Sequence, residues 1–224
     1  MNNSTLDFTV MEPYIPILLD GVKWTIYLTL AAVGIGIVLG LIAALMKMSR
    51  IKIFHLLGVT YIELIRGTPM LVQIFLIYFG LPQLFGFNIP AFIAAVSALG
   101  INSGAYVAEI IRAGIQAVDI GQTEAANSLG MNNFMTMRYI IIPQAIKNIL
   151  PALVNEFITL IKESSIVSVI GLEELTRKSD IIRSVTYRCF EPLITIALIY
   201  FVMTFTLSKV MGKIEGRLKK SDYR

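Results

Sequence analysis

The sequence has few of the residues that build disulfide-linked, metal-binding or catalytic proteins. It contains one cysteine, Cys189, and one histidine, His55, so it can form neither an internal disulfide framework nor a His/Cys metal-ligand cluster. It has no G-x-x-x-x-G-K-[ST] stretch, which excludes ATP binding through a P-loop of its own. No G-x-S-x-G motif and no paired catalytic carboxylates stand out. These absences disfavour an enzyme and a bound metal or cofactor.

Hydrophobic residues are abundant instead. They make up 56% of the 224 residues, against 15% charged residues, and the mean hydropathy is +0.74. Apolar runs of about 20 residues can cross a membrane as helices. Five such runs lie at about residues 24–46, 57–79, 89–111, 145–169 and 192–211. We expect an all-α integral membrane protein with five transmembrane helices, forming a single domain over residues 1–224.

The distribution of lysine and arginine predicts the orientation. Basic residues are concentrated after the first run, around the loop after the third run, and in the tail. They are Lys47, Arg50, Lys52, Arg112, Arg138, Lys147, Lys209, Lys213, Arg217, Lys219, Lys220 and Arg224. Such residues favour the cytoplasmic side, so the N-terminus is expected outside and the C-terminus inside. The first run follows an acidic segment and exceeds a signal-peptide core in length, which favours an uncleaved span.

The loop at residues 114–143 carries helix-boundary signals. Asp119 and Gln122 have capping-box spacing, which predicts a helix from about residue 120. Gly130 has the position and identity of a helix-ending residue with positive φ. Asn132 or Asn133 can cap a second helix, which is expected to end before Pro143. Helices this short need a surface to pack against.

That surface could belong to another protein or to the spans of this chain. Ala125 and Ala126 keep one side of the first helix flat, while Leu129, Met131 and Phe134 supply apolar anchors. The segment at residues 171–191 leaves a similar choice open. It is either a short amphipathic helix at the outer surface or a solvated loop.

Polar residues inside the spans indicate a transport path, because they are costly in lipid and usually face a cavity. Asn102 and Tyr106 share one helical face, and Glu156 and Thr159 share another. Asn102 and Glu156 lie near mid-membrane depth, where transporters bind substrate. We therefore predict a substrate site made by these four residues. An internal ion pair of Glu156 with Lys162 or Arg66 is the alternative.

Other charged residues in the spans are expected to form ion pairs. Glu63 and Arg66 lie three residues apart before Pro69, and a pair between them is favoured over a role in binding substrate. Lys162 and Glu163 are expected to form a structural pair or an outer gate. Glu109 and Arg112 are expected to pair at the cytoplasmic end of the third span.

Several stretches resemble one family. The triplet Glu124–Ala125–Ala126, its distance to Gly130 and the I-x-x-P ending at Pro143 resemble the EAA motif of the membrane subunits of bacterial ATP-binding-cassette (ABC) importers. Ile142 stands where that motif often has leucine. Residues 63–69, 101–106 and 162–171 are similar to the polar amino acid uptake branch, so the resemblance extends over nearly the whole chain.

The resemblance implies a type I ABC importer permease fold in the bacterial inner membrane, with a cytoplasmic coupling-helix loop. The implied ATPase-coupling residues are Glu124, Ala125, Ala126, Leu129, Gly130 and Met131. The implied partners are a cytoplasmic ATPase dimer that binds ATP and Mg, a second permease copy or paralogue, and an external amino-acid-binding protein. No nucleic acid is implied. An ion-coupled amino acid carrier and a membrane scaffold of an ATPase complex remain alternatives.

The sequence leaves the transported amino acid open, with a slight preference for basic ones because Glu156 is acidic. It does not distinguish a homodimer from a heterodimer, and it does not identify the binding protein.

Overall fold

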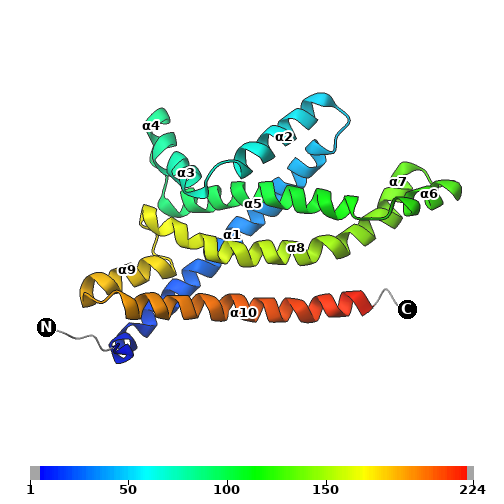
Figure 1. The fold of residues 1–224 in the computed structure, drawn as a ribbon. Helices are drawn as coiled ribbons and strands as arrows, with labels where there is room; N and C mark the ends of the chain where they lie inside the picture. The colour runs from blue at the N-terminus through cyan, green and yellow to red at the C-terminus, as the bar shows by residue number, and fades with distance from the viewer. Residues whose placement is uncertain (1–5, 221–224) are drawn as a thin grey trace.

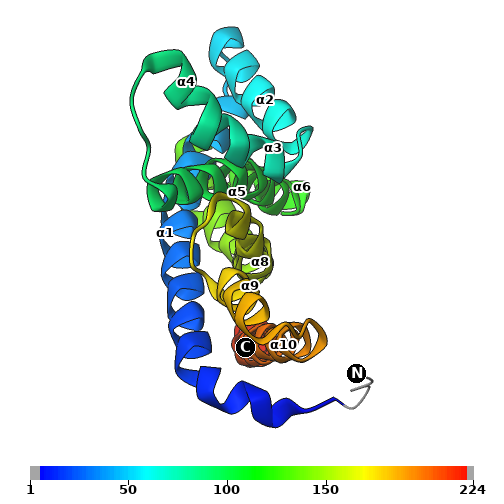
Figure 2. The same cartoon turned by 90° about the vertical axis from the view of Figure 1, so that its left-hand side faces the viewer.

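The computed structural model describes residues 6–220, and every regular element among them is helical. The elements, in chain order, are η1 (Phe8–Tyr14), α1 (Ile15–Lys47), α2 (Lys52–Arg66), α3 (Met70–Phe75), η2 (Leu76–Gly80), α4 (Leu81–Phe85), α5 (Ala91–Gln116), α6 (Ile120–Ser128), α7 (Asn133–Thr136), η3 (Met137–Ile141), α8 (Ile142–Glu163), η4 (Ser164–Ile170), α9 (Leu175–Thr186) and α10 (Phe190–Lys220). Helices α5, α8 and α10 lie side by side in one row (Figure 1). Helix α1 runs along one side of that row (Figure 2).

Three described helical segments are long and apolar enough to cross a membrane, and they are Phe8–Lys47, Ala91–Gln116 and Phe190–Lys213. A fourth crossing is possible if the bent pair Lys52–Arg66 and Met70–Phe85 counts as one span. The predicted span at residues 145–169 is helical over most of its length as α8, but it is not among these three segments. The all-helical membrane fold is therefore confirmed, whereas the count of five spans stays a prediction.

The predicted second span is broken. Helix α2 ends at Arg66, and the chain resumes as a helix at Met70 after a bend of 105°. Pro69 adopts extended backbone geometry, with φ −63° and ψ 137°, and precedes the first residue of α3. A proline lacks the N–H that would continue the helix ladder, and it disfavours helical geometry in the residue before it.

Helices α1 and α5 approach each other at glycines. A Cβ atom on Gly40 would lie 2.5 Å from Cγ1 of Val107, and one on Gly100 would lie 2.8 Å from Cγ2 of Ile35. Small residues allow close backbone approach between membrane helices, and side chains there would push the helices apart. The pair forms much of the buried core that supports the polar face of α5.

Helix α9 confirms that the segment at residues 171–191 contains a short helix. Its N-cap, Glu174, is fully buried and accepts hydrogen bonds from the backbone N–H groups of Thr176 (2.8 Å) and Arg177 (2.9 Å). The Tyr200 hydroxyl of α10 donates to the same carboxyl group at 2.8 Å. Burial raises the pKa of Glu174, outweighing these hydrogen bonds, which lower it. The cap thus ties α9 to α10.

The ends of the described chain lie at opposite ends of the molecule. Segment η1 lies at the end with α4 and α9, whereas the last turns of α10 lie toward the end with α6 and α7 (Figure 1). Of the predicted basic tail, Lys209 and Lys213 are exposed. Arg224 and the side chains of Arg217, Lys219 and Lys220 lie outside the described residues.

Candidate functional site

Asn102 lies at the break between α2 and α3. Its side-chain amide donates a 3.1 Å hydrogen bond to Oε1 of Gln73, and Asn102 is only 5% exposed. The Gln73 amide in turn donates to the carbonyl oxygens of Ile65 (2.8 Å) and Thr68 (3.1 Å), which the bend removes from the helix ladder. Gln73 was not identified as a functional residue from the sequence. One amide pair therefore stabilises the broken helix against α5.

Glu109 is the centre of an ion cluster one helical turn beyond Tyr106. Its carboxylate accepts a 2.6 Å hydrogen bond from Lys47 and bonds of 2.8 and 3.1 Å from Arg112. The predicted Glu109–Arg112 pair is confirmed. The nearest guanidinium nitrogen of Arg66 lies 4.0 Å from the same carboxylate. The Arg66 guanidinium carbon also lies 5.2 Å from the Tyr106 ring centroid.

The predicted Glu63–Arg66 pair is not among the ion pairs of the described residues. Glu63 lies 3.8 Å from Lys47 instead, while Arg66 is directed to Glu109. Arg66 is the last residue of α2, where the chain bends towards α5. Its side chain therefore reaches the neighbouring helix rather than the preceding turn of its own.

Glu156 and Thr159 are half-buried on α8, and Glu156 lies near the Ser103 hydroxyl of α5. That hydroxyl is buried and has no hydrogen-bond partner among the described residues. No ion pair of Glu156 with Lys162 or Arg66 is present in the described part of the chain, nor is one between Lys162 and Glu163. No described hydrogen bond joins Glu156 or Thr159 to Asn102 or Tyr106, which belong to the facing helix.

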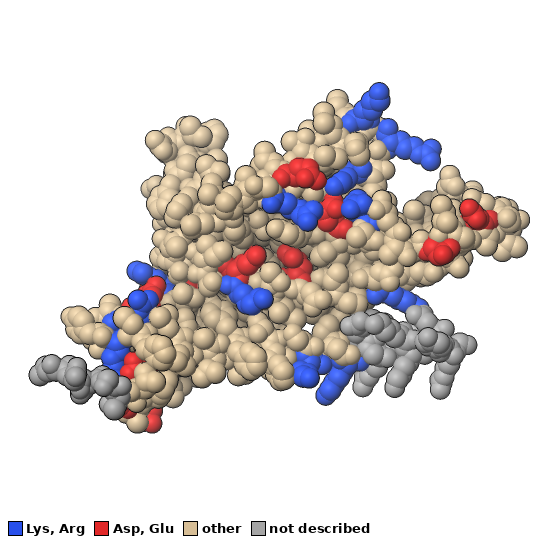
Figure 3. Space-filling view, viewed as in Figure 1, with Lys and Arg blue, Asp and Glu red and all other residues tan. Residues whose placement is uncertain are grey.

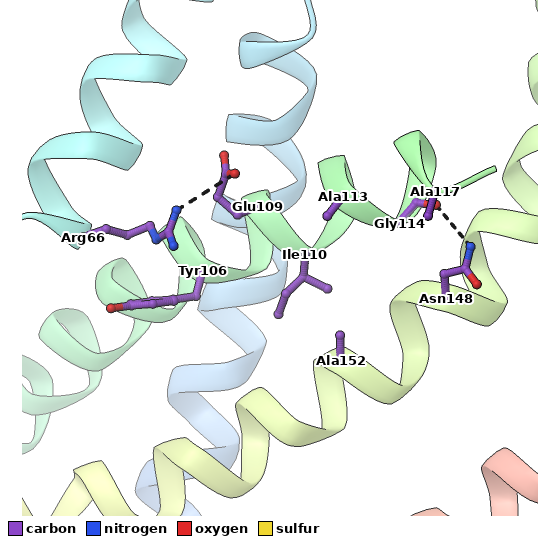
Figure 4. Close-up of a pocket in the computed structure, with 9 residues that line it drawn as sticks. All are labelled: Arg66, Tyr106, Glu109, Ile110, Ala113, Gly114, Ala117, Asn148 and Ala152. Carbon is purple, nitrogen blue, oxygen red and sulfur yellow. Dashed lines mark hydrogen bonds and ion pairs between the residues drawn. The ribbon is translucent and has the colours of Figure 1, made fainter. Parts of the chain in front are cut away.

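A hollow of about 450 Å³ lies between the end of α2, α5 and α8. Its lining residues are Arg66, Tyr106, Glu109, Ile110, Ala113, Gly114, Ala117, Asn148 and Ala152. Arg66 and Glu109 lie at one end, and Asn148 lies at the other, near Gly114 (Figure 4). In the space-filling view, charged side chains gather over α2, α5 and α8 in the middle of this face, and others lie towards its edges (Figure 3).

The loop at residues 114–143 forms two short helices, as predicted. Asp119 caps α6 by accepting a 2.7 Å hydrogen bond from the Gly121 N–H, and Asn132 caps α7 by accepting one of 2.9 Å from Met135. Gly130 between them has φ +78°, so the predicted left-handed conformation is confirmed.

The predicted end of the second helix before Pro143 is wrong. Helix α7 continues through the π-helical turn η3 directly into α8. Pro143 occupies the first turn of α8, where a missing N–H breaks no intrahelical bond. The wider π turn connects α7 to α8 without an intervening loop.

The two short helices leave a large apolar surface exposed. Leu129 is 83% exposed and Phe134 is 72% exposed, and Glu124 and Ala125 are also exposed. Ala126 is buried and Met131 is half-buried. The exposed face therefore contains only part of the predicted coupling set, and Ala126 packs within the chain.

Comparisons with known proteins agree on one family. The family described as "Binding-protein-dependent transport system inner membrane component" matches residues 36–220. The arginine transport system permease protein of Bacillus subtilis (strain 168) is 46% identical over 217 residues, covering 97% of this chain and 99% of that protein. The glutamine transport system permease protein of Escherichia coli (strain K12) is 38% identical over 214 residues, covering 95% and 98%.

Solved structures share the fold. A chain from the crystal structure of an amino acid ABC transporter with histidines is 65% identical, with a TM-score of 0.93, and the match covers 95% of this chain and 99% of that one. The inward-facing MetNI methionine ABC transporter has a TM-score of 0.77 at 18% identity, covering 92% and 98%. The second likeness bears on the fold alone.

Proposed function

Because the chain belongs to the binding-protein-dependent transport system inner membrane component family, we propose that it is the membrane subunit of an ATP-driven importer of polar or basic amino acids. The relatives named for arginine and glutamine transport support this substrate class. The observation that carries the assignment to an ATP-driven complex is the exposed apolar face of α6 and α7. It lies at one end of the polar helices α5 and α8.

The energy source is a separate ATPase, since this chain has no P-loop motif. ATP and Mg are bound by that partner, and this chain binds no cofactor. In the proposed complex, Leu129 and Phe134 enter a cleft of the ATPase while Glu124 and Ala125 line the contact. Gly130 holds the two helices at their angle. The face is cytoplasmic, as the distribution of basic residues favours.

The transport path lies along α5 and α8. Glu156 attracts the ammonium group of the amino acid or a basic side chain, and Thr159 adds a hydrogen bond. Tyr106 contacts the substrate as it passes along α5 towards the coupling helices, whereas Asn102 acts through Gln73 by holding the broken helix. A second copy or a paralogue encloses the charged face of Figure 3, and an external binding protein delivers the amino acid.

Reconstitution tests this assignment. The chain is co-purified with its neighbouring ATPase, placed in proteoliposomes, and assayed for uptake of labelled arginine, histidine and glutamine. Uptake should require ATP. Glu156→Gln should reduce it by at least about tenfold, because a lost charge-assisted contact is worth at least ~1.4 kcal/mol, while ATPase association persists. Glu63→Gln is the matched control, since the Glu63 side chain is 68% exposed.

The same reconstitution experiment distinguishes the alternative functions by different outcomes. Uptake that continues without ATP but requires an ion gradient would identify an ion-coupled carrier. Stable ATPase association without uptake of any amino acid would identify a scaffold. Unchanged uptake by Glu156→Gln would remove Glu156 from the substrate site without affecting the assignment of an ATP-driven permease.

A further inference from the structure

The ion cluster at the end of α2 has more positive than negative charges. Lys47, Arg66 and Arg112 surround the carboxylates of Glu63 and Glu109. Lys47 and Arg112 make close contacts with Glu109, at 2.6 and 2.8 Å. Arg66, 4.0 Å away, is the most weakly held cation. The uncompensated charge of the cluster therefore lies mainly on Arg66.

Nothing in the local backbone requires the Arg66 guanidinium as a helix cap. The Gly67 N–H donates to the Glu63 carbonyl oxygen at 2.8 Å, and the Gln73 amide donates to that of Ile65 at 2.8 Å. The Thr68 hydroxyl donates to the Leu64 carbonyl oxygen at 3.0 Å. The carbonyl groups of Glu63, Leu64 and Ile65 thus have their own donors.

The Arg66 side chain is 40% exposed and lies at the rim of the hollow in Figure 4. The hollow's volume of about 450 Å³ falls in the range of small-molecule pockets, about 300–1,000 Å³. Ala113 and Ala152 contribute only small side chains to the lining between α5 and α8. Guanidinium groups bind carboxylates through two parallel hydrogen bonds.

We propose that this hollow is a second binding site for the transported amino acid, in which Arg66 binds the α-carboxylate. This inference rests on the proposed function. The Tyr106 ring and Ile110 would contact the side chain of the amino acid, and Asn148 would offer its carboxamide. Ala152 precedes Glu156 by one turn of α8, about 6 Å along the helix axis. An amino acid leaving Glu156 towards the coupling helices reaches the hollow within that distance.

Thiol protection tests the second site. Ala113, an exposed residue of the lining, is replaced by cysteine in a Cys189→Ser background of the assembled complex. A membrane-impermeant maleimide is added from the coupling-loop side, without ATP. Arginine, histidine or glutamine should slow the labelling at position 113. Gln116→Cys, an exposed position on α5 outside the lining, is the matched control and should react equally with and without amino acid.

The role of Arg66 is tested in the same assay. Arg66→Gln should raise the half-protecting concentration by at least about tenfold, as expected for losing one charge-assisted carboxylate contact. Argininamide, which lacks the carboxylate, should protect poorly. Arg112→Gln, which alters the same ion cluster without lining the hollow, should retain protection. Glu156→Gln should also retain it, because the hollow is a separate site.

Three results would overturn the inference. The first is equal protection by argininamide and arginine, and the second is unchanged protection in Arg66→Gln. The third is a cysteine at position 113 that never reacts because another chain closes the hollow. ATP-dependent uptake without protection would reject the second site alone. Protection without uptake would instead reject the proposed function.

Discussion

The Asn102 amide of α5 donates to the Gln73 carboxamide 29 positions earlier in the chain, across the break in the second membrane segment. Both side chains are buried, at 5% and 6% exposure. Gln73 uses its own amide to bond backbone carbonyl groups that lost their helical partners. The bond therefore links the geometry of the break to the helix that carries Tyr106 and Glu109.

The Gln73–Asn102 link should be energetically coupled. Gln73→Leu leaves the Ile65 and Thr68 carbonyl oxygens without these side-chain donors, so we expect a loss of about 2–4 kcal/mol in unfolding free energy. Asn102→Leu should cost about 1–3 kcal/mol. The double variant should lose less than the sum, measured by unfolding of the purified complex in detergent. Strict additivity would show that the observed bond contributes nothing to stability.

Glu109 and Glu63 should respond very differently to neutralisation. Glu109→Gln leaves Lys47 and Arg112 without their shared carboxylate, and losing charged hydrogen bonds in this partly buried cluster should cost about 1.5–3 kcal/mol. The Glu63 side chain is 68% exposed, so Glu63→Gln should cost less than about 1 kcal/mol. Thermal midpoints of the two variants check this. Equal shifts would contradict a central role for Glu109.

Gly130 should tolerate asparagine better than valine. No atom lies within 4 Å of a Cβ built there, so the constraint is its φ of +78° rather than steric contact. A left-handed conformation costs ordinary residues about 1–2 kcal/mol, and asparagine adopts it more readily. Gly130→Val should therefore reduce ATPase co-purification and uptake more than Gly130→Asn.

Gly34→Val is the control for the Gly130 variants, because Gly34 also has open space but no positive φ. It should leave ATPase co-purification unchanged. Equal co-purification by Gly130→Val and Gly130→Asn would show that the left-handed hinge is not required for docking.

Glu174 should make stability depend on pH. Burial raises its pKa, so its contribution to stability is fully present below the unfolded value of about 4.3 and is lost as pH rises through the folded pKa. Glu174→Gln stays neutral, and its thermal midpoint should improve relative to wild type as pH rises from about 4 to 8. Glu173→Gln, which alters a partly exposed ion pair with Lys178, should have a small effect. A constant difference between wild type and Glu174→Gln would contradict the shift.

Local signals predicted the local structure well. Asp119, Asn132 and Gly130 act within a few residues of their own positions, so their helix boundaries could be read from the chain. The break at Pro69 also has a local cause, although the size of the bend does not follow from the local sequence. Pro143 was misleading because a proline ends one helix or begins another equally well, and the π turn before it has no clear sequence signal.

The contacts of the candidate site were less predictable because they depend on which helices meet. Spacing suggested that Glu63 would pair with Arg66, but the bend turns Arg66 towards Glu109. Gln73 could have been found by asking which side chain satisfies the carbonyl groups freed by Pro69. The place of Asn102 on the transport path stays a prediction, and its bond to Gln73 could be foreseen only by knowing that α3 returns to α5.

The close contact at Gly40 and Gly100 also affects how force crosses the molecule. Two helices packed this closely resist bending more than either would alone, so α1 stiffens α5. Helix α5 is about 39 Å long at 1.5 Å per residue and continues through a short turn into α6. A displacement of α6 is therefore transmitted along α5 to the opposite end of the molecule, with little bending of α5.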